Sequence, residues 1–168
     1  MNETGDLSLL DDLIKRALAR INLCADPKQL RQMAANALEQ DQHIVRHAAE
    51  LRLYAILPAE KPGTLEYDVW RSIFALEGAL SAERGKTTRL ARTRQKIARD
   101  GEHRTVADLV VGKASDGFQK LLERNMPELT FEAVALRHAE RFEDEITAAA
   151  KARLVGAGFD QGMLTKLT

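Results

Sequence analysis

The chain has 168 residues, and its 45% hydrophobic and 30% charged content is that of an ordered globular protein rather than a disordered one. No apolar run reaches the about 18 residues of a transmembrane helix, and the acidic start lacks the bases of a signal peptide. The net charge is zero, with 25 basic and 25 acidic residues, and the single Cys24 excludes an internal disulfide, so we expect a cytoplasmic protein.

Apolar residues recur at helical spacing along the whole sequence, with neither a strand pattern nor an internal repeat. Helix-starting signals stand at Asp26 before Pro27 and at Thr64 after the linker PAEKPG. Gly85 and Gly101 are expected to end helices. The expected helices span residues 8–21, 27–38, 41–55, 64–83, 88–99, 105–111, 115–124, 130–138 and 143–155.

These elements predict an all-α fold, a compact orthogonal bundle of about eight to nine helices. We expect a single domain over residues 1–155, with an N-terminal helical half at 8–83. The second half, 84–155, would contain a basic helix and several short helices. The glycine-rich end, residues 156–168, is expected to form a flexible tail.

One segment, ERGKTTRLARTRQKIARDG at residues 83–101, concentrates positive charge. From Arg84 to Arg99 there are seven cations and no acid, which leaves 18 cations and 25 acids elsewhere. The GKT triplet resembles the end of a phosphate-binding loop, but such a loop has a glycine where Leu80 stands and follows a strand rather than a helix. We therefore interpret Gly85 as a helix terminator and expect no nucleotide cofactor.

The helix expected at residues 88–99 has a basic stripe on the side opposite Leu90 and Ile97. Guanidinium groups suit phosphate oxygens, and the free amide groups at a helix start can hold a further phosphate. The sequence therefore predicts nucleic-acid binding, DNA before RNA, through phosphate contacts with little base readout. The residues expected to bind are Lys86, Thr87, Thr88, Arg89, Arg92, Lys96 and Arg99.

Two other interpretations of the basic stripe stay open. Its cations can be paired with the acids of the rest of the chain, as on any solvated helix face. Alternatively, the protein is an interaction or oligomerisation module whose basic helix engages an acidic partner or the acidic part of a second copy.

Two charged residues interrupt the apolar sides of neighbouring helices. Glu77 lies among the core positions of the helix expected at 64–83, and Arg94 points to the apolar side of the basic helix. A charge that faces a core normally has a partner, because an unpaired buried charge is costly. We therefore predict a structural ion pair between Glu77 and Arg94 where the two helices pack.

Other motifs are weaker. His43, His47 and Glu50 share one helix face, which gives a third hypothesis, a metal-assisted hydrolase, but no glutamate stands between the histidines as in HExxH. KIARDGEHRTVADLVVG has the outline of a helix-turn-helix with too short a turn. No Ser/His/Asp set, Cys/His set or carboxylate pair is indicated, so we expect no catalytic residue, metal or cofactor, and an enzymatic function stays open.

The elements RTRQKI, SDGF and LTFEAVALRH, within residues 65–155, carry a resemblance. This part of the sequence resembles small helical proteobacterial proteins to which no reaction is assigned. The resemblance implies a shared helical fold and a bacterial cytoplasmic setting, and it implies no catalytic residue.

Overall fold

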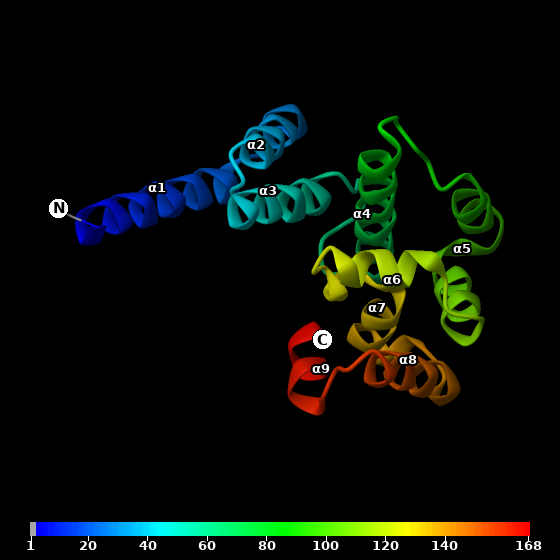
Figure 1. Ribbon diagram of the computed structural model, residues 1–168. Helices are drawn as coiled ribbons and strands as arrows, with labels where there is room; N and C mark the ends of the chain where they lie inside the picture. Colours follow the sequence, from blue (N-terminus) through cyan, green and yellow to red (C-terminus); the bar gives the residue numbers. More distant parts are fainter. Residues whose placement is uncertain (1–2) are drawn as a thin grey trace. The chain divides into compact units, whose positions relative to one another are not determined.

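The structure is a computed structural model that describes the backbone of residues 3–168 and the side chains from Leu9 onward. Within this range the chain forms nine α-helices and two single-turn 3-10 helices, η1 (Pro127–Leu129) and η2 (Ala139–Arg141), and no strand (Figure 1). The all-α fold expected from the helical periodicity is therefore confirmed.

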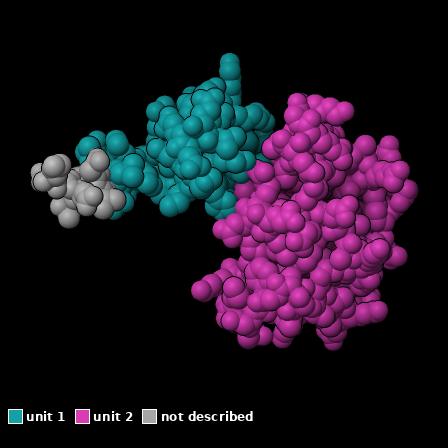
Figure 2. All heavy atoms as spheres, viewed as in Figure 1, with its two compact units in different colours: residues 1–57 teal, residues 58–168 magenta. Residues whose placement is uncertain are grey.

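Contacts between the helices divide the chain into two compact units, Met1–Leu57 and Pro58–Thr168 (Figure 2). The division falls at the start of the linker PAEKPG, where two prolines prevent one helix from continuing into the next. It differs from the single domain over residues 1–155 that we expected from the sequence, and from its subdivision at residue 83.

The first unit consists of α1 (Glu3–Leu23), α2 (Pro27–Glu39) and α3 (His43–Ile56), with α3 packed on both other helices. Asp26 caps α2 as expected, since its Oδ1 accepts a hydrogen bond from the Lys28 amide at 2.8 Å. The small core is made of side chains from all three helices: Ile21, Leu30, Ala37, Val45, Ala49 and Leu53.

The second unit is built around α4 (Leu65–Arg84), which packs against α5 (Ala91–Val111), α6 (Asp116–Glu123) and α7 (Phe131–Arg137). Next, α8 (Asp144–Gly156) packs on α5 and α7, and α9 (Gln161–Leu167) packs on α7. Hydroxyl groups of Thr64, Ser115 and Thr130 cap α4, α6 and α7, at the positions where the sequence places helix starts.

Two elements differ from the sequence expectation. The helices expected at 88–99 and 105–111 are the two arms of α5, which bends at Gly101 with φ 81° and ψ 168°, a conformation that suits glycine. The end of the chain is also ordered into α9 rather than a flexible tail. Asp160 caps this helix, and Leu164 and Leu167 are buried against other helices of the unit.

Candidate nucleic-acid interface

The basic segment begins in the loop that joins α4 to α5. Gly85 ends α4 in the left-handed conformation, with φ 65°, which confirms its interpretation as a helix terminator. The loop is held by α4 side chains, since the Thr88 amide donates to Ser81 Oγ at 2.9 Å and the Leu90 amide donates to Glu77 Oε1 at 2.9 Å.

These two bonds explain why α5 begins at Ala91 and not at Thr88, as expected from the sequence. Because the Thr88 and Leu90 amides are bonded to side chains of α4, residues 88–90 follow that helix and do not form the first turn of α5. The Thr88 hydroxyl also donates within the loop, to the Lys86 carbonyl at 3.1 Å. Thr87 and Thr88 therefore lie in a loop and not at a helix start, and the Thr88 amide that was expected to meet phosphate is already bonded.

The structure brings Glu77 and Arg94 together, as the sequence predicts. Arg94 Nε donates to Glu77 Oε1 at 2.7 Å, and Arg94 Nη2 donates to Oε2 at 2.8 Å. The guanidinium carbon lies 4.9 Å from the Trp70 ring centre and 5.6 Å from that of Phe74. The hydrogen bonds to Glu77 raise the pKa of Arg94 above its ordinary value, despite partial burial. This pair joins α4 to the first turns of α5.

Two of the predicted phosphate-binding cations already have carboxylate partners. Lys96 Nζ donates to Asp108 at 2.6 Å and to Asp100 at 2.9 Å, and Arg99 donates to both oxygens of Asp100. The hydrogen bonds that Lys96 donates to Asp108 and Asp100 raise the pKa of Lys96, and the hydrogen bonds from Arg99 and Lys96 hold the pKa of Asp100 well below its usual range. The contacts of Lys96 and Arg99 therefore match the alternative interpretation, in which cations of the basic stripe pair with acids of the same chain.

The bend at Gly101 makes the pair between Lys96 and Asp108 possible. In a straight helix the twelve residues from Lys96 to Asp108 would span about 18 Å. Because the second arm of α5 turns back at Gly101, Asp108 reaches Lys96. Within its own arm Asp108 also pairs with Arg104, four residues earlier, at 2.9 Å.

The remaining cations of the segment are exposed. They extend from the end of α4, through the loop, into the first turn of α5, and none of them forms a salt bridge with an acid in the described part of the chain. These residues, which we call the loop cations, are Arg84, Lys86, Arg89 and Arg92. The charge of Arg84, added to the hydrogen bond from Lys120, lowers the pKa of the neighbouring Glu83. Lys86, Arg89 and Arg92 were among the residues predicted to bind phosphate, whereas Arg84 was not.

The residues of the metal hypothesis do not converge. His43 is exposed and contacts Asp41 at 2.9 Å, whereas Glu50 pairs with Arg46 at 3.0 Å. Among the side chains from Leu9 onward, no three histidine, cysteine or acidic residues are arranged as a metal site.

Sequence analysis did not identify a buried polar cluster around Asp68 of α4. This carboxylate accepts a hydrogen bond from His138 Nε2 at 2.9 Å and lies 3.1 Å from Arg137 Nη1 and 3.2 Å from Arg71 Nη1. Burial raises the pKa of Asp68, but the hydrogen bond from His138 and the charges of both arginines outweigh it and hold the pKa below its ordinary value. The available signal was the helical spacing, which puts Asp68 and Ser72 on the buried face of α4.

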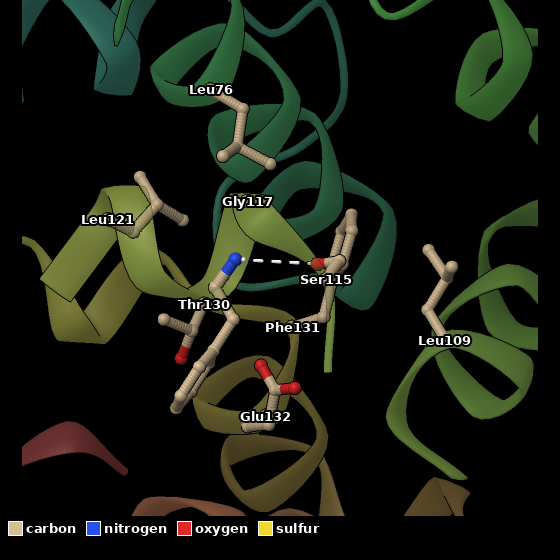
Figure 3. A pocket seen from close by; sticks show the side chains of 9 residues that line it. Leu76, Leu109, Ser115, Gly117, Leu121, Thr130, Phe131 and Glu132 are labelled. Carbon is tan, nitrogen blue, oxygen red and sulfur yellow. Dashed lines mark hydrogen bonds between the residues drawn. The ribbon is translucent and has the colours of Figure 1, made fainter. Parts of the chain in front are cut away.

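A second buried acid, Glu132 of α7, accepts a hydrogen bond from Arg153 Nη1 at 2.5 Å. Glu132 also lines a small hollow between α4, α6 and α7, beside Leu76, Gly117 and Phe131 (Figure 3). The cavity of about 10 Å³ is the size of a single water at most, so it is a packing gap and not a ligand site. Asp68 and Glu132 each join two helices of the second unit: Asp68 joins α4 to the end of α7, and Glu132 joins α7 to α8.

Comparisons with protein-family models, with curated proteins and with solved structures gave no match to this chain. Among the described helices, none combines the length and the apolar character needed to cross a bilayer.

Proposed function

We propose that the protein binds nucleic acid, DNA in preference to RNA, through phosphate contacts of the loop cations, in the cytoplasm of a bacterium. The observation that carries the proposal is the contrast within one segment. Lys96 and Arg99 are bound to acids, whereas the four loop cations are exposed and available to an external anion.

The support of the loop favours such a role. Glu77 and Ser81 hold the loop backbone through the Leu90 and Thr88 amides, so less conformational freedom is lost when an anion binds. A guanidinium group offers a planar set of donors to phosphate oxygens. The uncapped start of α5, where no side chain bonds the first amides, adds a favourable partial charge beside Arg89 and Arg92.

The side chains nearby do not favour base recognition. Only 5% of the residues are aromatic, and Trp70 and Phe74 are already packed against the Arg94 guanidinium. Proteins that hold single strands stack bases on exposed aromatic rings. We therefore expect duplex binding with little dependence on sequence.

The test is fluorescence anisotropy with a labelled DNA duplex over a range of salt concentrations. Four phosphate contacts correspond to a log–log salt slope of about −4, from about 0.9 per neutralised phosphate. Changing Arg84, Lys86, Arg89 and Arg92 to glutamine should remove binding, and each single change should reduce the slope by about one. Exposed helix and loop positions tolerate glutamine, so the thermal midpoint should change little.

The matched control is Lys96→Gln with Arg99→Gln, which removes two cations of the same segment that are already paired. This variant should keep the wild-type slope while losing some stability. The proposal is wrong if wild-type protein fails to bind duplex DNA or RNA at about 50 mM salt, or if the control removes two units of slope. In the first case an acidic protein partner becomes the better account of the loop cations.

A further inference from the structure

Between Leu10 and Leu13, α1 carries an exposed apolar stripe. The helix extends past α2 and α3 of its own unit (Figure 1), and the side chains of Leu10 and Leu13 are 46% and 54% exposed. At 100° per residue, Leu10, Leu13, Ile14, Ala17 and Ile21 lie on one face of the helix. The same face is thus buried at Ile21 and open at Leu10.

The covered end of this stripe borders a groove. Ala17 and Ile21 of α1, together with Met33 and Ala37 of α2, line an open hollow of about 190 Å³ in the first unit. This is smaller than the about 300–1,000 Å³ of pockets that hold small molecules, and the polar side chains of Arg20, Asn36, Gln40 and Gln42 complete its lining. The apolar part of the hollow beside Ala17 can take a leucine side chain from another helix.

We propose that α1 pairs antiparallel with α1 of a second copy of this chain, crossing near Leu13. In this arrangement Leu13 of each copy lies beside Leu13 of the other, and the exposed Leu10 lies beside Ala17 of the second copy, at the edge of the hollow. Because the pair is two-fold symmetric, the exposed side chains of Leu10 and Leu13 are covered in both copies and the interface is closed.

The charges on α1 favour this orientation. Asp11 and Asp12 precede the crossing point, and Lys15, Arg16 and Arg20 follow it, all exposed. Asp11 and Lys15 are on the same flank of the stripe, four residues apart. With the crossing at Leu13, Asp11 of each copy faces Lys15 of the other. A parallel pair would instead place like charges together.

The first experiment is light scattering with size-exclusion chromatography on the full chain, over a range of concentrations. Wild-type protein should reach twice its 18.7 kDa monomer mass. Leu10→Glu with Leu13→Glu should stay monomeric with unchanged helicity, because both side chains are exposed in the single chain. Leu38→Glu on α2, at a side chain that is 53% exposed, is the matched control and should still dimerise.

The second experiment tests the orientation by exchange of charges. Asp11→Lys and Lys15→Asp should each weaken self-association several-fold, because each places two like-charged pairs in the dimer. The double variant should regain the wild-type affinity, and an equimolar mixture of the two single variants should form a mixed dimer.

A third measurement locates the crossing point. Leu13→Cys in a Cys24→Ser background should form an intermolecular disulfide on mild oxidation. Wild-type Cys24 should not, since its two copies would lie about 30 Å apart along the helices.

A chain that stays monomeric at all concentrations overturns the proposal. So does a dimer that survives Leu10→Glu with Leu13→Glu, because it must use another surface. Loss of folding in that variant would show that the stripe is covered within a single chain, and it would also overturn the proposal. Rapid cross-linking through Cys24 would show a parallel pair and contradict the orientation.

Discussion

Removal of Glu77 should be among the more damaging single changes in the second unit. Its carboxylate, only 10% exposed, accepts three hydrogen bonds, from Arg94 Nε, Arg94 Nη2 and the Leu90 amide. Glu77→Leu leaves the guanidinium without its counter-ion and the amide without an acceptor. Breaking a buried ion pair costs about 3–5 kcal/mol. Because the Arg94 side chain is 25% exposed and water can reach it, we expect the lower end, about 3 kcal/mol.

A double-mutant cycle separates the pair from its surroundings. Arg94→Leu alone strands the carboxylate and should cost a similar amount. Glu77→Leu with Arg94→Leu leaves only the Leu90 amide without its partner, at about 1 kcal/mol. The double variant should therefore lose less stability than the sum of the single variants, by about 2 kcal/mol or more.

Urea unfolding followed by tryptophan fluorescence measures these differences at the site itself. Trp70 is the one tryptophan of the chain, and its ring lies 4.9 Å from the Arg94 guanidinium. Glu83→Leu, at an exposed acid of the same helix that pairs with Lys120, is the control and should cost less than about 1 kcal/mol. Single-variant losses below about 1 kcal/mol, or additive losses in the double variant, would refute the argument.

Two further predictions concern buried charge and backbone conformation. The pKa of Asp68 is lower in the folded protein than in the unfolded chain, so its carboxylate stabilises the fold fully above about pH 4 and loses this effect as the pH falls through the folded-state pKa. The difference in unfolding free energy between wild type and Asp68→Asn should therefore shrink in acid. Urea titrations at several pH values measure it, and a constant difference would contradict this. Gly101→Ala should cost about 1–3 kcal/mol in thermal unfolding from its positive φ alone, since a Cβ there meets nothing within 4 Å. Gly156→Ala, in the regular helix α8, should cost nothing, and equal effects at both sites would show that conformation is not the cause.

Helix starts and ends were predictable where a single local side chain decides them. Asp26, Thr64, Ser115 and Thr130 bond amides within the next turn, and Gly85 supplies the left-handed residue that ends α4. These interactions lie within a few residues along the chain, so their chemistry can be seen in the sequence.

The start of α5 and the end of the chain depend on contacts that are distant in sequence. Glu77 binds the Leu90 amide across thirteen residues, and this bond delays the helix beyond Thr88. The tail looks flexible because it is rich in glycine, yet Leu164 and Leu167 are buried against other helices. Composition describes the local preference of the chain and not the surface against which it packs.

Local and distant contacts also decide which charges of the basic segment are paired. Glu77 and Arg94 could be paired from the sequence because each places a charge on an apolar helix face. For Lys96 the spacing of four residues to Asp100 was a local signal of pairing, whereas its second partner, Asp108, is twelve residues away and reaches it only through the bend at Gly101.

The bend also explains why the loop cations stay available. Asp100 and Asp108 lie at and beyond the end of the first arm of α5, so they reach Lys96 and Arg99 in its last turn. Arg92, two turns earlier, is about 12 Å from Asp100 along the helix, too far for an ion pair. Acids placed beside the bend can therefore neutralise only the C-terminal end of the basic arm. Positive charge remains at the opposite end, where Glu77 and Ser81 hold the loop against α4 and where the proposed phosphate contacts would form.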